Sequence, residues 1–281
     1  MDQSVQALVN YKGIAVVAWL AALFMLERLA PRTPAPPDLP PWRRVTRNAM
    51  LWVFNSGLSP LVVIPVSVWA TSHALDWRPA WWSGAPGLII DLLILDCWIY
   101  WWHRANHESQ FLWRFHEIHH LDEFLDTTSA IRFHFGEVLM GAAVRALIVI
   151  LLGIPIASII VFETLILIAA VFHHSNIRLA PRLEAALQWV VITPGIHWVH
   201  HHAIRRDTDS NYGTILSVWD RLFATRSRTR RWAGMPIGVE NRRELDIGRL
   251  ILRPFRPRDD AAGGKAAAVG KAEESADGAD R

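Results

Sequence analysis

Residues 96–120 read DCWIYWWHRANHESQFLWRFHEIHH and hold five of the thirteen histidines of the chain. These five form two groups with helical spacing, namely His103 with His107, and His116 with His119 and His120. Residues three or four apart share a helix face, so each group can direct its imidazoles toward one point. The H-x-x-H-H spacing occurs again in a third group, made of His197, His200 and His201. Because neutral imidazole is the commonest metal ligand, this pattern predicts a metal site.

The composition indicates an integral membrane protein. Of 281 residues, 52% are hydrophobic and fifteen are Trp, a residue enriched at membrane interfaces. The formal charge of +3 is small and gives no sign of nucleic-acid binding. Cys97 is the only cysteine, so a disulfide framework and a thiolate metal site are both excluded.

Long apolar stretches predict an all-α fold, a transmembrane helical bundle with a histidine-rich helical cap. They occupy 13–26, 50–70, a segment from 88 into the histidines, and 138–173. The first is shorter than the span of about twenty residues, so its helix must borrow flanking residues or stop near the interface. Pro60 and Pro65 predict a kink in the second. The amphipathic segment 181–191 is expected to lie along the membrane surface.

The stretch at 138–173 is too long for one span, so we expect a helical hairpin that turns at residues 153–155. Arg145 lies nine residues before Ile154 and Glu163 nine residues after it. At about 1.5 Å per residue the two charges sit at equal depth, and a lone charge in the bilayer is costly. An ion pair between Arg145 and Glu163 is therefore expected, with Asp91 as the alternative partner of Arg145.

The distribution of arginine orients the predicted bundle. Residues 27–47 hold five Arg, whereas 73–84 hold one, which places the former on the cytoplasmic side of an inner or plasma membrane. Counting spans from there places every histidine group on the same side. The histidine-rich cap is therefore expected at the cytoplasmic face of a multi-pass protein.

Two carboxylates and a tyrosine accompany the first histidine group. Asp91 and Asp96 would be costly if they faced lipid, so both are expected to face the protein interior. Asp96 and Tyr100 share one helix face with His103 and His107. We therefore expect Asp96 to orient a ligand imidazole, as carboxylates often do next to a metal.

His134 and His174 lie between the groups and bring the candidate ligands to ten. Ten imidazoles are too many for one ion, since a structural zinc uses about four protein ligands. Two ions with about five nitrogen ligands each would use all ten imidazoles and would leave an open position for oxygen or substrate. Iron, copper, zinc and nickel all accept nitrogen ligands. A site at the ends of membrane helices suits attack on an unactivated C–H bond of a lipid, which favours oxygen-activating iron.

The chain resembles the fatty acid hydroxylase and sterol desaturase superfamily over residues 88–225. The matching motifs are HRANH at 103–107, LWRFHEIHH at 112–120, RFHFGE at 132–137, HHSNIRL at 173–179, TPGIHWVHH at 193–201 and NYGTILSVWDRLFAT at 211–225. The resemblance implies ten metal ligands, which are His103, His107, His116, His119, His120, His134, His174, His197, His200 and His201. Asp96, Tyr100 and Asn176, which lies in the fourth motif, are the candidate catalytic residues. Leu121 and Phe135 stand where the family commonly has serine and proline.

The same resemblance implies a di-iron enzyme that uses O2 to hydroxylate or desaturate a lipid, with electrons from a separate ferredoxin or reductase. Four regions are expected: anchor helices and a proline-rich linker at 1–87, a catalytic domain at 88–225, a basic segment at 226–256 and a disordered tail at 257–281. Two alternatives stay open. One is a membrane metal transporter or sensor, and the other is a zinc-dependent lipid hydrolase, because HEIHH at 116–120 fits the H-E-x-x-H pattern.

Overall fold

The computed structural model describes residues 3–37 and 40–256, so the expected tail at 257–281 lies outside the described residues. Within them the structure is helical, with isolated bridges and no strand, which confirms the all-α prediction. The longer helices are α1 (Gln3–Leu29), α2 (Pro41–Leu58), α3 (Ile64–Ser72), α4 (Gly84–Glu108), α5 (Gln110–His120), α6 (Phe135–Leu152) and α7 (Ile156–His174). The shorter ones are α8 (Pro181–Leu187), α9 (Pro194–His200), α10 (Arg205–Thr208), α11 (Val218–Leu222) and α12 (Ile247–Leu252). A π-helix, η1 (Ser59–Val63), and two 3-10 helices, η2 (Thr127–Ile131) and η3 (Arg253–Phe255), complete the set.

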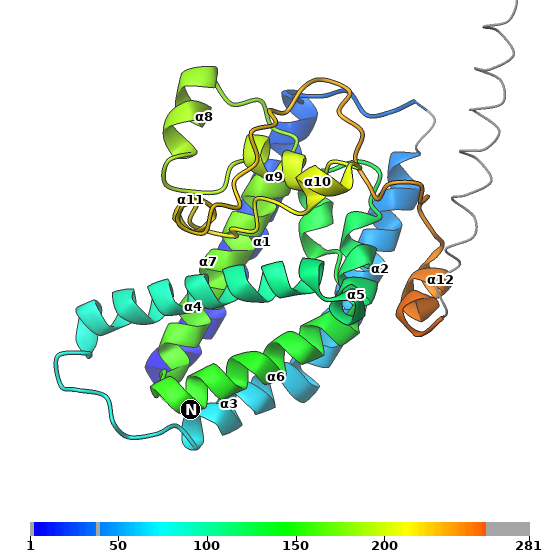
Figure 1. The fold of residues 1–281 in the computed structure, drawn as a ribbon. Coiled ribbons are helices and arrows are strands. Elements are labelled where there is room, and N and C mark those ends of the chain that lie inside the picture. Colours follow the sequence, from blue (N-terminus) through cyan, green and yellow to red (C-terminus); the bar gives the residue numbers. More distant parts are fainter. Residues whose placement is uncertain (1–2, 38–39, 257–281) are drawn as a thin grey trace, which may run out of the picture.

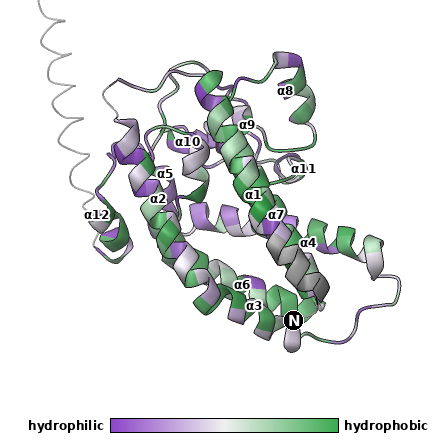
Figure 2. Ribbon diagram, turned by 180° about the vertical axis from the view of Figure 1, so that it is seen from behind, coloured by the Kyte–Doolittle hydropathy of each residue, from purple (hydrophilic) through white to green (hydrophobic). Residues whose placement is uncertain are grey.

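Several of these helices have the length and composition of membrane spans. Among the described residues the qualifying segments are Pro41–Ser72, Gly84–Glu108, Phe135–Leu152 and Ile156–His174. Hydrophobic residues colour most of α3 and α6 in Figure 2, while hydrophilic residues gather around α10 and the start of α2. The 14-residue apolar stretch near the N-terminus lies in a helix of 27 residues, so α1 does borrow flanking residues.

Helices α1 and α7 pack side by side and run in the same direction (Figure 1). The Trp19 indole donates to the carbonyl of Ile168 at 3.0 Å, and further along, the Glu27 carboxylate accepts from the backbone N–H of Asn176 at 3.0 Å. The α2–η1–α3 segment packs against α6 in the same way. The last turns of α4 and α7 therefore meet α5 and α9 at one end of the bundle, which we call the histidine end.

The predicted kink in the second apolar stretch is confirmed. Pro60 and Pro65 have no N–H to donate, so an undisturbed α-helix cannot continue through them. The chain widens into the π-helix η1 and returns to α-helix as α3. A π-turn is one of the few ways in which a helix absorbs such an interruption.

The hairpin prediction is also confirmed. Helix α6 ends at Gly153, which adopts a left-handed conformation with φ of 63°, and Pro155 precedes the first residue of α7. A side chain at Gly153 would approach the carbonyl oxygen of Leu75 to 2.9 Å, so glycine is required there. Arg145 and Glu163 form the expected ion pair, at 3.0 Å. Glu163 also binds Lys12 from α1, a third charge that the sequence argument did not include.

Reversing one charge of this group should destabilise the bundle. Glu163→Arg places three cations together, and an unpaired charge in the bilayer costs on the order of 3 kcal/mol. The melting temperature in detergent or nanodiscs should therefore fall clearly. Because Lys12 would oppose a swapped pair, the rescue is best tested in a Lys12→Met background. There, Arg145→Glu combined with Glu163→Arg should recover most of the loss. Losses that simply add would show that the pair contributes nothing.

Asp91 is buried, as expected, and is not the partner of Arg145. Its carboxylate accepts from the Arg78 guanidinium at 2.8 Å, the Trp82 indole at 2.9 Å and the Ser158 hydroxyl at 2.7 Å. These bonds join the connection between α3 and α4 to α7, at the end of the bundle opposite the histidines. Asp91 therefore has a structural role.

Candidate metal centre

The structure brings nine histidines together in two adjacent groups. The first group contains His103, His107, His116, His120 and His200, and the second contains His119, His174, His197 and His201. Within each group the candidate ligand nitrogens all lie within 4.8 Å of one another. The tenth candidate, His134, lies apart. It caps α6 by accepting from the N–H of Gly136, and its other ring nitrogen bonds the carbonyl of Ile251 at 3.0 Å.

Each H-x-x-H-H cluster is divided between the two groups. On α5, His116 and His120 are four residues apart and belong to the first group, whereas His119 belongs to the second. At the end of α9 the second group takes His197 and His201, and the first takes His200. Neighbouring residues on a helix point about 100° apart. One cluster therefore serves both groups, and α5 and α9 lie where they can bridge two ions.

Backbone carbonyls fix the orientation of four imidazoles. In the first group, Nδ1 of His103 donates to the carbonyl of Tyr212 at 2.8 Å, and Nδ1 of His200 donates to that of Ser210 at 2.6 Å. In the second, the acceptors are the carbonyl of Arg132 for His119, at 3.0 Å, and that of Ala170 for His174, at 2.8 Å. A carbonyl only accepts, so Nδ1 carries the proton and Nε2 is left with a lone pair.

Carboxylates orient two more imidazoles of the first group. Nδ1 of His116 lies 2.8 Å from Glu137, and Nδ1 of His107 lies 3.4 Å from Asp209. Such partners fix the tautomer and raise the basicity of a ligand imidazole. Sequence reasoning did not assign this role to either residue. Glu137 ends the RFHFGE motif, which was the available signal, whereas Asp209 lies in a loop without a recognisable pattern.

The nitrogens that remain fit metal ions. Nε2 of His107, His116, His120 and His200 is buried and has no hydrogen-bond partner. An unsatisfied buried polar atom is costly, and four in one place indicate a bound cation. In the second group, consecutive Nε2 atoms of His119, His174, His197 and His201 lie 3.0–3.1 Å apart. Two nitrogens each about 2.1 Å from one ion, at near right angles to each other, would have this separation.

Burial also keeps these side chains neutral. Away from the membrane spans, burial lowers the pKa of His119, His120, His197, His200 and His201 well below the ordinary value, and the neighbouring imidazoles lower it further. A neutral imidazole has the lone pair that a metal needs. The site is therefore ready to bind cations near neutral pH without first losing protons.

The three candidate catalytic residues bond to other chain segments. Asp96 accepts from the Trp219 indole at 2.8 Å and from the N–H of Leu216 at 3.2 Å, rather than from an imidazole as expected. It lies seven residues from His103, about 10 Å along the helix, and its carboxylate bonds α11 and the segment before it. The Tyr100 hydroxyl bonds that of Thr225 at 2.9 Å.

Asn176 connects the chain that follows the C-terminal end of α1 to the chain that follows the C-terminal end of α7. Its side-chain oxygen accepts from the N–H of Thr33 at 3.1 Å, and its amide nitrogen donates to the carbonyl of Thr33 at 2.7 Å. The Arg231 guanidinium also donates to the Asn176 oxygen, at 2.8 Å. These bonds fix the chain where it leaves α7, directly after His174.

Asp220 holds the loop that supplies two of the orienting carbonyls. Its carboxylate accepts from the N–H groups of Tyr212 and Gly213 at 2.7 and 2.9 Å. A side chain at Gly213 would meet Asp220 and Ile192 at 2.8 Å, so the loop closes only around glycine. The NYG and WD residues of the last motif therefore form the frame that orients His103 and His200.

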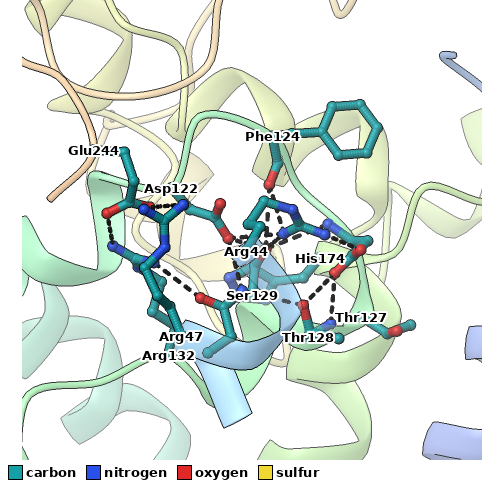
Figure 3. Close-up of polar contacts among 12 residues, drawn as sticks. Arg44, Arg47, Asp122, Phe124, Thr127, Thr128, Ser129, Arg132, His174 and Glu244 are labelled. Carbon is teal, nitrogen blue, oxygen red and sulfur yellow. Dashed lines mark hydrogen bonds and ion pairs between the residues drawn. The ribbon is translucent and has the colours of Figure 1, made fainter. Parts of the chain in front are cut away.

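A buried charge network supports the segment that follows α5. Figure 3 shows Arg44 of α2 in contact with acceptors from this segment. Its guanidinium donates to Asp122 at 2.9 Å, to the carbonyl of Phe124 at 3.0 Å and to Asp126. Burial alone would raise the pKa of Asp122, but the charges of Arg44 and Arg132 outweigh it and hold the pKa below its ordinary value.

Arg132, whose carbonyl orients His119, is fixed by its own side chain. The guanidinium donates to the carbonyl of Ile118 at 2.7 Å and to the Asn48 side chain at 2.9 Å. It also donates to Glu244 at 2.8 Å, and Figure 3 labels both Arg132 and Glu244. Residues from α2, from α5 and from the segment before α12 therefore hold Arg132 in place, and with it the carbonyl that orients His119 of the second group. This long-range support has no signature in the local sequence.

An apolar cavity of about 180 Å³ lies beside both groups. It borders histidines of each group, including His103 and His116 of the first and His119 and His197 of the second. The apolar part of its wall comes mainly from α4, α7 and the segment before α6, and consists of Ile99, Trp102, Ala130, Phe133, Ile166, Leu167 and Ala170. The Phe133 ring stacks on His119, with centroids 4.5 Å apart. An alkyl chain in this cavity would lie against the imidazoles.

Fold and site together define a helical membrane protein with a paired histidine centre. Residues 88–225 match the family model described as fatty acid hydroxylase. The chain belongs to the fatty acid hydroxylase and sterol desaturase superfamily through this segment.

Relatives with curated names agree with this assignment. The chain is 28% identical to the ornithine lipid hydroxylase OlsE of Rhizobium tropici over 196 residues, 70% of this chain and 58% of that protein. It is 29% identical to the alkylglycerol monooxygenase of Danio rerio over 166 residues, 57% of this chain and 34% of that protein. Protein CER1-like 1 of Arabidopsis thaliana is 26% identical over 185 residues, 62% of this chain and 28% of that protein. No solved structure matches the chain.

Proposed function

We propose that this protein is a membrane di-iron oxygenase that hydroxylates an alkyl chain of a lipid. The observation that carries the proposal is the pair of buried histidine groups beside an apolar cavity. The first group would hold one iron with five imidazoles, and the second would hold another with four. The names of the relatives, a lipid hydroxylase and a monooxygenase, support hydroxylation over desaturation.

The residues of the chain have separable tasks in this reaction. Bound iron would supply the activation of O2 that C–H oxidation requires. Ile99, Ile166 and Leu167 would hold the alkyl chain and keep water from the reacting carbon. Glu137 and the carbonyls around the site would fix the tautomer and orientation of five of the ligand imidazoles. In balance, one C–H bond, O2, two electrons and two protons give an alcohol and water.

The orientation and the electron supply belong to the same proposal. The arginine-rich segment 27–47 lies at the histidine end, which we place at the cytoplasmic face. O2 and the lipid reach the site from the bilayer, whereas the two electrons come from a separate ferredoxin or reductase on the cytoplasmic side.

Two observations weigh against the alternative functions. In a zinc hydrolase with the H-E-x-x-H pattern, Glu117 would act as the general base beside the metal. Here the Glu117 carboxylate instead lies 3.3 Å from the Arg253 guanidinium. Transporters carry their ligands near the bilayer midplane on broken helices. The two groups here lie at the ends of α4 and α7 and on the short helices beyond them.

Lipid analysis with isotopically labelled O2 tests the proposed reaction. Cells that express the protein should accumulate a lipid heavier by one oxygen atom, and that atom should carry the label. Cells with a Glu137→Gln variant should form about 10–100-fold less, because a lost partner of a ligand imidazole has that effect. A product lacking two hydrogens would instead indicate desaturation. An unchanged lipid profile would contradict an oxygenase altogether.

A further inference from the structure

A row of arginines follows α11 and lines a pocket together with Gly195 and Ile196 of α9. Residues 225–231 read TRSRTRR, and the exposed positions are Arg226, Arg228 and Arg230, whereas Ser227 and Thr229 are partly buried. This period of two is that of an extended chain. The alternation therefore presents three guanidinium groups on one side of the segment, which we call the arginine row.

Asp207 fixes the arginine row in this position. Its carboxylate accepts from the hydroxyls of Ser227, at 3.1 Å, and Thr229, at 2.8 Å. The N–H of Ser227 donates to the Asn211 side chain at 3.0 Å. The inward side chains are thus bound to the loop that carries the orienting carbonyls, and the three arginines are exposed on the outside, where Arg226 donates to the Gln188 side chain at 3.4 Å. Among the described residues, no carboxylate lies within 4.0 Å of the Arg228 or Arg230 guanidinium.

The arginine row borders a wide pocket of about 500 Å³. Arg32 and Arg231 add two more cations to its wall, and Glu184 is the single carboxylate there. Glu184 is already engaged, because it accepts from the N–H of Gly195 at 2.9 Å. The pocket is therefore strongly positive and suits an acidic partner.

Two residues of the pocket wall are chain neighbours of the metal groups. Ile196 and Asn211 line it. Ile196 precedes His197, a member of the second group, and Asn211 follows Ser210, whose carbonyl orients His200 in the first. In Figure 1 this part of the chain runs past α8 and α9 at the histidine end. A partner in the pocket would be separated from the proposed irons only by the backbone of α9 and this loop.

Helix α8 indicates that the pocket faces water. Its residues Pro181, Glu184 and Ala185 line the pocket together with Gln188, which caps the helix, and the four share one helix face. The exposed apolar Leu183 leaves α8 from another face, and the exposed Trp189 follows the C-cap of the helix. A soluble partner therefore reaches the pocket more readily than a lipid does.

We infer that the arginine row and its pocket form the docking surface for the electron donor, a small acidic iron–sulfur protein. The inference rests on the function proposed above, because hydroxylation needs two electrons from outside the chain. The donor is oxidised by one electron in each of two encounters, and the metal centre is reduced by two. Acidic groups of the donor pair with the guanidinium groups, and this places its cofactor against the backbone behind His197 and His200.

Charge reversal tests the docking surface. The iron-loaded protein in neutral nanodiscs is compared with R226E/R228E/R230E and with the control R43E/R249E/R256E, which reverses three exposed arginines of α2, α12 and the residue after η3. The probe is an acidic [2Fe–2S] ferredoxin reduced by its reductase. Affinity and rate of iron reduction should fall at least tenfold in the first variant and less than twofold in the control. Added salt should weaken binding of the wild type and control, but not of the first variant.

Reduction by dithionite, a small molecule that needs no docking surface, separates this inference from the proposed function. Iron that dithionite cannot reduce would contradict the redox function and the docking of a donor with it. Equal ferredoxin affinity and reduction rate in all three proteins, with dithionite reduction intact, would overturn the docking surface alone. The docking surface would also be overturned if R226E/R228E/R230E lost binding to phosphatidylglycerol vesicles but kept ferredoxin binding. The arginine row would then be a lipid contact.

Discussion

His200→Ala should abolish lipid oxidation while the protein still inserts and folds. The change removes one of five nitrogens from the first group and leaves the four of the second in place. A catalytic metal contributes several kcal/mol, so its loss or displacement corresponds to about a thousandfold or more in turnover. His197→Ala should have an equal effect through the second group, although His197 and His200 are only three residues apart.

Product formation from labelled O2 measures the activity, and iron per chain identifies which group is affected. Each variant should retain about one iron, because the H-x-x-H-H cluster is divided between the groups. The matched control is His73→Ala, because that exposed imidazole bonds the carbonyl of Trp69 in its own helix. It should leave activity and iron content unchanged. Full activity in His200→Ala would show that the third histidine group, His197, His200 and His201, is not part of the active site.

Arg44→Leu should lower the free energy of unfolding by about 3–5 kcal/mol, the usual cost of breaking a buried ion pair. Arg44 is 2% exposed, and its removal leaves the buried carboxylate of Asp122 without its ion pair and that of Asp126 with only Arg28, at 3.8 Å. The segment that these residues hold leads to Arg132 and hence to His119. Activity should therefore fall with stability.

Chemical denaturation in detergent, followed by circular dichroism, measures this loss. Arg43→Leu is the matched control, since Arg43 is the exposed neighbour on the same helix, and the midpoint should stay near that of the wild type. Arg44→Lys should be intermediate because it keeps the charge but loses the forked geometry. An Arg44→Leu variant as stable as the wild type would show that the network does not hold the segment in place.

The helical bundle was predictable because the thickness of the bilayer sets the length of an apolar stretch that can span it, about twenty residues. Apolar stretches and their breaks located the spans, the kink at Pro60 and the turn at Gly153. Depth counting from that turn found the pair of Arg145 and Glu163. The third partner, Lys12, could not be found in this way, since no local pattern states that α1 packs against α7 in parallel.

The site was predictable as a set of histidines but not as a geometry. Spacing places His116, His119 and His120 near one point, whereas the docking of α5 against α9 decides which of them faces which group. His134 has the same motif context as the ligands, yet it bonds a carbonyl 117 residues further along the chain. The orienting acceptor of His103 is likewise supplied from 109 residues away. Such contacts exist only after folding.

Counting iron in the intact protein tests the central claim most directly. The protein is loaded with iron under anaerobic conditions and studied by elemental analysis and Mössbauer spectroscopy. Zinc in a sample purified in air would not decide the matter, because zinc lies above iron in the affinity order. Two irons per chain, both in nitrogen-rich surroundings, are expected from the two histidine groups. A single iron at saturation in fully active protein would contradict the account.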